Sequence, residues 1–472
     1  MLVRKYIGRK LAEYYAQPSH KVVGRSIDLE ASKANNNNGQ LLSSLMGEWH
    51  WKRVFQKIYE EREGHWLTPV ELFQPHYSYV LGDFCAHCYD RMEKNNRTNS
   101  KNNDKENNRN TNTHCNSTKQ FEIVELGGGR GTNANWILSY LREHKPHVYS
   151  SLISYTLVDS SPSLHQTQKE RFLGGPHADK VRFELKDLSD VAQGTVQLLS
   201  KSEIPTVLMG MEVLDNLPHD KVRGTVRHKL EQAEVVVPQN NSKQKQQQLR
   251  EKFVPLNDPL LKIILQKVPS YYTQQQQQFL QTDACWVPSI ACGVVHHAIN
   301  QRNNLGLVFA DFDWLPPPDL DPSTSLDDEQ DHDFSSSSSS KNKNKQSIVD
   351  EETPAGGSPI VTDMEGKDHK SYLSAPGHCD ILFPTNFEKL AAFAKRCLPP
   401  TGAATRTVRR PVQVIRVEKQ SHFLERVGPE HVAKTRSWLT GHTPLLYDFA
   451  NCSVLTISPD EGTRHEMGQE KE

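Results

Sequence analysis

Apolar residues are scarce in this chain of 472 residues. Only 36% are hydrophobic, whereas compact globular proteins reach about 45–50% when glycine is counted. No window approaches the roughly 18 uninterrupted apolar residues of a membrane-spanning helix, so we expect no membrane span. Net charge is scarce as well, because 56 Lys and Arg nearly balance 57 Asp and Glu. This balance argues against a field that attracts the whole protein to nucleic acid.

The eight cysteines are too scattered for a disulfide framework, and no secretory signal sequence is recognisable, so we expect a reducing compartment. Cys85 and Cys88 form a CxxC motif, but no second pair stands at zinc-site spacing. Both fall in Tyr79–Met92, which has the pattern of a helix. We therefore interpret the motif as part of a helix face and predict no metal site.

The first sixteen residues have apolar side chains at helical spacing, with basic residues between them. A mitochondrial presequence has a similar pattern, but such segments avoid acidic residues, and Glu13 lies inside this one. An amphipathic first helix of the domain, ended by Pro18, is the interpretation that we prefer.

Several segments are too polar to form a core and are predicted to be disordered insertions, since their apolar side chains cannot offset the entropy of ordering. The predicted organisation is an N-terminal helical part at 1–92, an Asn-rich insertion at 93–119, a core at 120–316 with a polar insertion at 238–250, a second insertion at 317–370 and a C-terminal part at 371–472.

The rest of the chain alternates strands with helices. Helical patterns are present in Trp49–Glu63 and Val80–Met92, and later in Thr132–Glu143, Ser163–Phe172 and Phe387–Cys397. Short apolar runs predict strands at Phe121–Leu126, Tyr155–Val158, Val181–Leu185, Thr206–Met211, Leu305–Ala310 and Asp380–Phe383. Such runs between helices indicate a parallel sheet covered on both faces. The predicted fold class is α/β: a doubly wound, mostly parallel, Rossmann-like sheet with an N-terminal helical layer.

A glycine-rich turn follows the first strand. Gly127, Gly129 and Gly131 spell G-x-G-x-G, so neither the dinucleotide G-x-G-x-x-G nor a P-loop is matched. Glu125 precedes the first glycine; its carboxylate disfavours a pyrophosphate and favours a cationic ligand. A purely structural turn is the alternative.

Acidic residues recur where the following strands end. Asp159 ends the second strand, Asp187 follows the third, and Glu212 ends the fourth. Ligands of such sheets bind outside the carboxyl ends of the strands, where an acid accepts hydrogen bonds from ribose hydroxyls. Together with Glu125, these residues predict one shared site, although acids at strand ends also start turns.

Glu212 and Asp215 are three residues apart, directly after a strand predicted to be buried. Two carboxylates in that place suit a guanidinium, which they orient bidentately, or a sulfonium nearby. The alternative is a helix N-terminus, where acids interact favourably with the helix dipole.

These motifs together resemble the MidA-like family of class I S-adenosylmethionine-dependent methyltransferases, which includes a mitochondrial complex I assembly factor that methylates protein arginine. The segments that carry the resemblance are Thr68–Glu71, Val124–Thr132, Leu157–Pro162, Glu212–Pro218 and Asp380–Phe383. The chain departs from the family pattern at Met211, where Asn is common, and at Gly128, where Pro is common.

The resemblance implies S-adenosylmethionine as cofactor, with Gly127, Gly129 and Gly131 under its methionine part. It implies further that Asp159 holds the ribose and Asp187 lies near the adenine, and that Glu212 and Asp215 face the methyl acceptor.

By this resemblance, the expected function is methylation of an arginine in a protein substrate, with a respiratory complex I subunit as the expected acceptor and the mitochondrion as the expected compartment. Two other functions compete with this one: a non-catalytic assembly protein that keeps the fold, and a nucleotide-dependent oxidoreductase. The alternative compartment is the cytoplasm. A nucleic-acid substrate is disfavoured by the neutral charge, and the sequence leaves the oligomeric state open.

Overall fold

The structure is a computed structural model that describes residues 1–17, 42–61, 67–106, 120–224, 230–236, 249–269, 284–319, 357–399 and 413–459. In this part of the chain, no helix combines the length and the apolar character needed to cross a bilayer.

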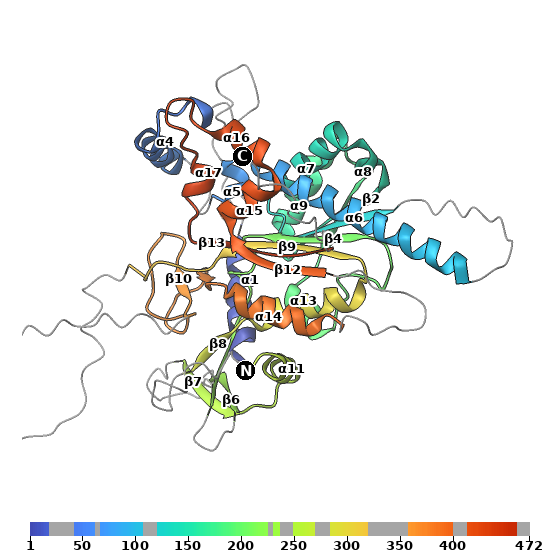
Figure 1. The fold of residues 1–472 in the computed structure, drawn as a ribbon. Coiled ribbons are helices and arrows are strands. Elements are labelled where there is room, and N and C mark those ends of the chain that lie inside the picture. The colour runs from blue at the N-terminus through green and yellow to red at the C-terminus, as the bar shows by residue number, and fades with distance from the viewer. Residues whose placement is uncertain are drawn as a thin grey trace, which may run out of the picture.

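A seven-stranded sheet with the order β12-β13-β9-β4-β1-β2-β3 forms the centre of the molecule (Figure 1). Its strands are β1 (Phe121–Leu126), β2 (Leu152–Asp159), β3 (Val181–Leu185), β4 (Thr206–Met211), β9 (Leu305–Phe312), β12 (Gln413–Lys419) and β13 (Cys452–Pro459). The first five pair in parallel, β13 is antiparallel to β9, and β12 is antiparallel to β13. The predicted mostly parallel α/β sheet is thereby confirmed.

Helices cover both faces of this sheet, as a doubly wound fold requires (Figure 1). One face and the layer outside it contain α4 (Glu48–Glu61), α5 (Pro69–Leu72), α6 (His76–Glu106), α7 (Thr132–His144), α8 (Pro146–Ser151), α9 (Pro162–Phe172), α15 (Gln420–Val427), α16 (Pro429–Thr435) and α17 (Pro444–Tyr447). The other contains α10 (Leu188–Gln193), α11 (Pro259–Lys267), α13 (Ser289–Gln301) and α14 (Phe387–Cys397). Each face has its own apolar core, because strands such as β4 bury side chains on both sides.

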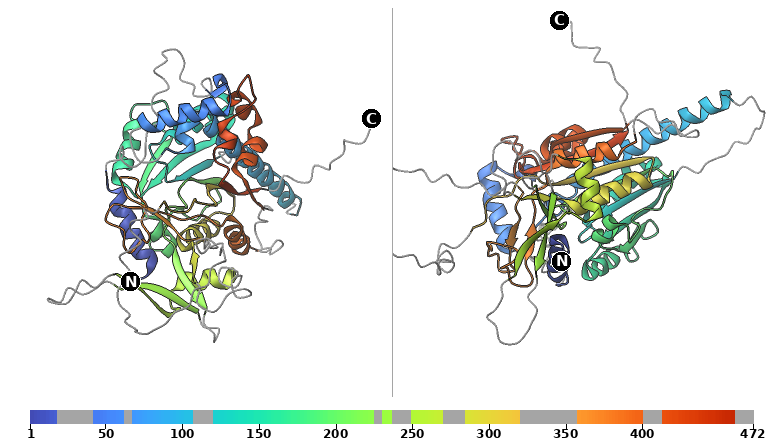
Figure 2. Two further views of the ribbon diagram at one scale, coloured as in Figure 1. Left: turned by 90° about the vertical axis from the view of Figure 1, so that its left-hand side faces the viewer. Right: turned by 90° about the horizontal axis from the view of Figure 1, so that it is seen from below.

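Two small sheets and the first helix form a third apolar cluster beside the main sheet. One has the order β7-β6-β5-β8, and β10 pairs with β11 in the other. The strands are β5 (Asp220–Gly224), β6 (Leu230–Val236), β7 (Arg250–Pro255), β8 (Cys285–Val287), β10 (Ile360–Thr362) and β11 (Asp380–Leu382). Helix α1 (Val3–Tyr15) packs against β5, β6 and β11, next to the green strands in Figure 2. The preferred interpretation of the N-terminus as a helix of the domain agrees with this packing.

The structure differs from the sequence prediction in four places. Helix α6 continues past Met92 to Glu106, so the first part of the predicted insertion 93–119 is helical, and 107–119 lies outside the described residues. Within the predicted insertion 317–370, residues 357–370 are folded, contrary to the prediction, because β10 pairs with β11 and buries Val361. Most of the remainder of that segment lies outside the described residues, as does 238–248 of the polar insertion.

The other two differences concern the C-terminal part. The strand predicted at Asp380–Phe383 belongs to the small β10–β11 sheet, whereas β12 and β13, which sequence patterns did not reveal, extend the main sheet. Helix α14 begins after Asn386, whose side chain accepts a hydrogen bond from the Lys389 N–H at 3.0 Å.

Candidate active site

A cavity of about 330 Å³ lies at the carboxyl ends of β1, β2, β3 and β4, where ligands of doubly wound sheets bind. Its wall includes six of the eight residues that the sequence predicted for the site: Glu125, Gly127, Gly129, Asp159, Asp187 and Glu212. Gly131 and Asp215 lie outside the lining. The four acids predicted to share one site therefore do converge on the cavity.

The glycine turn approaches the cavity closely. Gly127 and Gly129 have positive φ angles of 62° and 51°, a conformation that side-chain-bearing residues rarely adopt. A Cβ atom on Gly127 would also stand 2.8 Å from Cγ2 of Val213, another lining residue. A side chain at Gly127 would therefore be excluded both by the backbone conformation and by Val213 in the cavity wall. Gly131, with φ 77°, instead forms the N-cap of α7, so its position supports the helix and not the cavity wall.

Glu125 is buried at the end of β1 and already has two partners. Its carboxylate accepts hydrogen bonds from Nδ2 of Asn133 at 2.8 Å and from the hydroxyl of Tyr155 at 2.7 Å. Burial raises the pKa of Glu125. The carboxylate is held in place by α7 and β2 while it still lines the cavity.

Asp159 ends β2 and is also buried. Its carboxylate accepts hydrogen bonds from the Ser161 N–H at 2.9 Å and from Nε2 of Gln168 at 3.3 Å, and burial raises its pKa to about 6. Gln168 also donates to the Gly129 carbonyl at 2.9 Å, which ties α9 to the glycine turn. Gln168 was not predictable as a site residue, because it lies inside α9 and belongs to no motif.

Asp187 is exposed and caps α10. Its side chain accepts a hydrogen bond from the Ser189 N–H at 2.7 Å. The capping bond fixes one carboxylate oxygen at the rim of the cavity, beyond β3.

Glu212 lines the cavity at the end of β4, in a strained backbone conformation with φ 52°. Its N–H donates to the Ala310 carbonyl at 2.9 Å, which continues the pairing of β4 with β9. Burial, with a contribution from the nearby Asp311 charge, raises the pKa of Glu212 well above its ordinary value. Backbone strain of this kind is characteristic of functional sites.

Asp215 lies behind the cavity wall, in a buried group of acids. Burial raises its pKa well above the ordinary value, and the charges of Asp311, Asp380 and Glu212 raise it further. Its Oδ1 atom has no hydrogen-bond partner among the described residues. Asp311 and Asp380 were missed as site residues, although Asp311 stands at the end of a predicted strand; that position was the one available signal.

Helix α1 supplies a cavity wall that the sequence did not predict. Tyr15 lines the cavity, and its hydroxyl donates to Oδ1 of Asn216 at 2.6 Å. Arg4, on the same helix, is buried and forms ion pairs with Asp220 at 2.5 Å and Asp258 at 2.6 Å. These contacts anchor α1 to the domain beside the predicted site.

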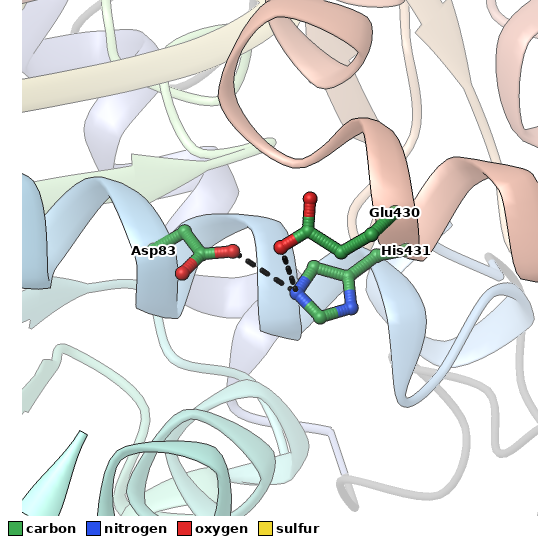
Figure 3. A group of neighbouring side chains, drawn as sticks. All are labelled: Asp83, Glu430 and His431. Carbon is green, nitrogen blue, oxygen red and sulfur yellow. Dashed lines mark hydrogen bonds and ion pairs between the residues drawn. The ribbon is translucent and has the colours of Figure 1, made fainter. Parts of the chain in front are cut away.

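One group in the described residues has the composition of a metal site: Asp83, Glu430 and His431 (Figure 3). The Asp83 carboxylate faces Nε2 of His431 at 3.0 Å, and it also accepts from the Tyr140 hydroxyl at 2.6 Å and pairs with Lys145 at 3.1 Å. With a lysine supplying the positive charge, we interpret the group as a polar link between α6, α7 and α16.

The CxxC pair behaves as the sequence analysis expected of a helix face. Cys85 and Cys88 are buried in α6, and burial raises the pKa of both thiols. The group of described residues with the composition of a metal site, Asp83, Glu430 and His431, does not include them.

The cavity fits an adenosyl cofactor with an amino-acid tail. The glycine turn leaves room for close approach, Asp159 offers acceptor oxygens at a strand end, and Asp187 lies farther along the same edge. When bound, S-adenosylmethionine supplies a methyl group on a positively charged sulfur, and Glu125 and Glu212 give the cavity an electrostatic environment suited to that charge.

Comparison with solved structures supports the fold. The chain is similar to a Burkholderia thailandensis protein described as a "likely methyl transferase" and bound to S-adenosyl-homocysteine, with a TM-score of 0.54 at 14% identity over 97% of this chain and 87% of that one. A native crystal structure of an uncharacterised protein from the same organism gives a TM-score of 0.50, also at 14% identity and with the same coverage. A search of curated proteins gives no match.

The sequence model of one family matches residues 107–343, which is half of the chain. Its description is that of S-adenosyl-L-methionine-dependent methyltransferases, in agreement with the cofactor and the family that the motifs predicted. The chain therefore belongs to the Methyltransf_28 family of S-adenosyl-L-methionine-dependent methyltransferases.

Proposed function

We propose that this methyltransferase transfers the methyl group to an arginine side chain of a protein. The observation that carries the proposal is a deficit of positive charge around Glu212, Asp215 and Asp311. Among the described residues, none of these three acids forms an ion pair with a lysine, arginine or histidine. Buried carboxylates without a cation are costly. A cationic acceptor entering beside Glu212 would relieve that cost.

The chemistry of the acceptor agrees with this arrangement. A guanidinium is cationic and a poor nucleophile, so the protein must align one of its nitrogens and stabilise its charge until a proton leaves. Glu212 lines the cavity and suits the aligning role, while Asp215 lies behind it. A cation in the cavity would favour ionisation of both acids and so lower the pKa that burial raises. Methyl transfer then requires in-line geometry, with reacting atoms about 3–3.5 Å apart, and exclusion of water.

The resemblance to a family with a mitochondrial member makes a respiratory complex I subunit the first acceptor to test. It also makes the mitochondrion the first compartment to examine. Both belong to the proposal.

The test is methylation of a mitochondrial lysate with isotope-labelled S-adenosylmethionine, followed by mass-spectrometric mapping of the labelled residues. Wild-type protein is expected to label arginine. Glu212→Gln is expected to lose at least about 100-fold in rate, the scale seen when one group that stabilises charge is removed.

Glu388→Gln, at an exposed position in the first turn of α14, is the matched control and is expected to retain full activity. Label on lysine, or equal labelling by the wild type and by Glu212→Gln, would refute the arginine proposal. Cofactor binding without any labelling would favour the non-catalytic assembly protein.

A further inference from the structure

Tyr15, near the end of α1, is bonded to two different turns at the edge of the cavity. Its hydroxyl donates to Oδ1 of Asn216 at 2.6 Å, and its backbone carbonyl accepts from the Ser161 hydroxyl at 2.9 Å. Asn216 belongs to the turn that begins at Glu212, directly after β4. Ser161 belongs to the turn that follows Asp159, at the end of β2. A single residue of α1 therefore joins two sides of the cavity.

Helix α1 is a fixed base for these bonds. Near its first residue, Arg4 forms ion pairs with two buried acids. Farther along, the side chains of Ile7 and Leu11 are buried in the apolar cluster formed with the small sheets. Moving the helix would expose them to water, which the hydrophobic effect opposes. Near the last residue, the Ser163 hydroxyl donates to the Gln17 carbonyl at 3.2 Å. Both ends of the helix are thus attached to the domain.

The side chain of Asn216 is held from a second direction as well. Its Nδ2 donates to Oδ1 of Asp380 at 2.9 Å, and Asp380 is the first residue of β11. One end of the amide group therefore accepts from Tyr15, and the other donates to Asp380. Because α1 packs against β11, the two partners come from elements that are themselves in contact. The amide fits between them in one orientation.

The same turn is also supported from outside the cavity. The Leu214 and Asp215 N–H groups donate to Asp311, and the Asp215 carbonyl accepts from the Phe383 N–H at 2.9 Å. None of these four residues lines the cavity, whereas Tyr15 and Asn216 both do. The hydrogen bond from Tyr15 to Asn216 therefore holds the turn on the side where a substrate would lie.

We propose that Tyr15 is a positioning residue for methyl transfer, which acts through Asn216 to place Glu212 relative to the bound cofactor. The turn after Asp159 belongs to the cofactor side, and the turn after Glu212 belongs to the acceptor side. Transfer needs in-line geometry with reacting atoms about 3–3.5 Å apart, so a small shift of one turn lowers the rate more than it lowers cofactor affinity. The inference rests on the proposed function, because that function places the acceptor beside Glu212.

The first test separates rate from affinity. Tyr15→Phe removes the hydroxyl and keeps the ring. Transfer from isotope-labelled S-adenosylmethionine to a mitochondrial lysate, measured over a range of cofactor concentrations, gives kcat and the KM for the cofactor. The variant is expected to lower kcat by at least about tenfold, as for a misplaced reacting group. The KM, and the Kd of S-adenosylhomocysteine from calorimetry, should change by less than about threefold.

Tyr6→Phe is the matched control, because it removes a hydroxyl from the same helix outside the cavity wall. The Tyr6 ring packs against Tyr372 at a centroid distance of 6.0 Å. This variant should retain the wild-type kcat. Asn216→Leu removes the other half of the bond and should reproduce the loss of Tyr15→Phe. The double variant should lose no more than the larger single loss, since both substitutions break one interaction.

The second test does not depend on activity. Hydrogen–deuterium exchange of the full-length protein, followed by mass spectrometry, measures how often the turn at 212–217 opens. Tyr15→Phe is expected to speed exchange there by about 2- to 10-fold, as for the loss of one neutral hydrogen bond, while Tyr6→Phe leaves it unchanged. Unchanged exchange at the turn, or a loss of cofactor affinity with kcat preserved, would overturn the proposal. Label on lysine would refute only the arginine acceptor, because the effect of Tyr15→Phe on the rate would persist.

Discussion

The carboxylate of Asp311 accepts a hydrogen bond from the backbone N–H of Asp215 at 3.1 Å, across 96 residues of sequence. The same oxygen accepts from the Leu214 N–H at 2.7 Å, and the other oxygen accepts from the Phe312 N–H. A buried acid on β9 therefore holds the turn that carries Asp215 and follows Glu212. The side chain that fixes the turn is also one of the charges that raise the pKa of both acids.

Replacing Asp311 with Asn is expected to change how stability depends on pH. Burial raises the Asp311 pKa from 3.8 to about 7, so the folded protein holds the proton more tightly than the unfolded chain. The group therefore makes the free energy of unfolding fall as pH rises between about 4 and 7, with a slope of at most about 1.4 kcal/mol per pH unit.

Urea unfolding of the wild type and of Asp311→Asn at pH 5, 6, 7 and 8 measures this effect. The difference in the free energy of unfolding between Asp311→Asn and the wild type is expected to shift in favour of the variant as the pH rises from 5 to 8, because only the wild type loses stability over this range. Parallel pH profiles of the two proteins would show that Asp311 is not the group responsible.

Gly127→Ala is expected to weaken S-adenosylhomocysteine binding by at least about tenfold. Its φ of 62° strains an alanine by roughly 1–2 kcal/mol, and the added Cβ would stand 2.8 Å from Val213 in the cavity wall. Gly174→Ala is the control that introduces backbone strain without a contact in the cavity wall. That exposed glycine has a similar φ of 68°, but no atom lies within 4 Å of an added Cβ. Calorimetry should show a loss for the first variant alone; equal affinities would contradict the placement of the glycine turn.

Asp159→Asn is expected to weaken S-adenosylhomocysteine binding by about tenfold, because an ionised acceptor of the ribose hydroxyls is lost. With a pKa of about 6, wild-type Asp159 becomes protonated below that pH, so its affinity should fall between pH 7.5 and pH 5. The Asn variant should lose this part of the pH dependence. Identical pH dependence of binding in the two proteins would exclude Asp159 as a ribose acceptor.

Arg4→Met is expected to destabilise the protein by about 3–5 kcal/mol, since it leaves two buried acids, Asp220 and Asp258, without their cation. Cofactor affinity should fall as well, because α1 forms a wall of the cavity. Lys5→Met, at an exposed position on the same helix, is the control. A loss below 1 kcal/mol in urea unfolding would mean that α1 is not anchored through Arg4.

The central strands were predictable because their burial leaves a direct trace in the sequence. The predicted bounds of β1, β3 and β4 match the structure. Strands β1 and β4 are largely apolar runs that end at a turn or an acid, and β3 alternates apolar with charged residues shortly before Asp187. By contrast, β12 is only half buried, and its partner β13 lies more than 30 residues farther along the chain. Neither apolar periodicity nor a local turn marked them.

The site was predictable where one residue ends one strand, as with Asp159 and Glu212. It was not predictable where partners come from distant segments. Asp311 reaches Asp215 only because β9 is the neighbour of β4, and Tyr15 reaches Asn216 only because α1 packs beside the cavity. Strand order and helix docking decide such contacts, and neither is encoded by spacing along the chain.

A crystal structure of the protein with S-adenosylhomocysteine tests the central claim most directly. We predict the ribose hydroxyls on Asp159, the adenine near Asp187, the amino-acid end over the turn of Gly127 and Gly129, and the sulfur on the side of Glu212. A ligand bound outside this cavity, or bound with its adenine over the glycine turn, would contradict the account.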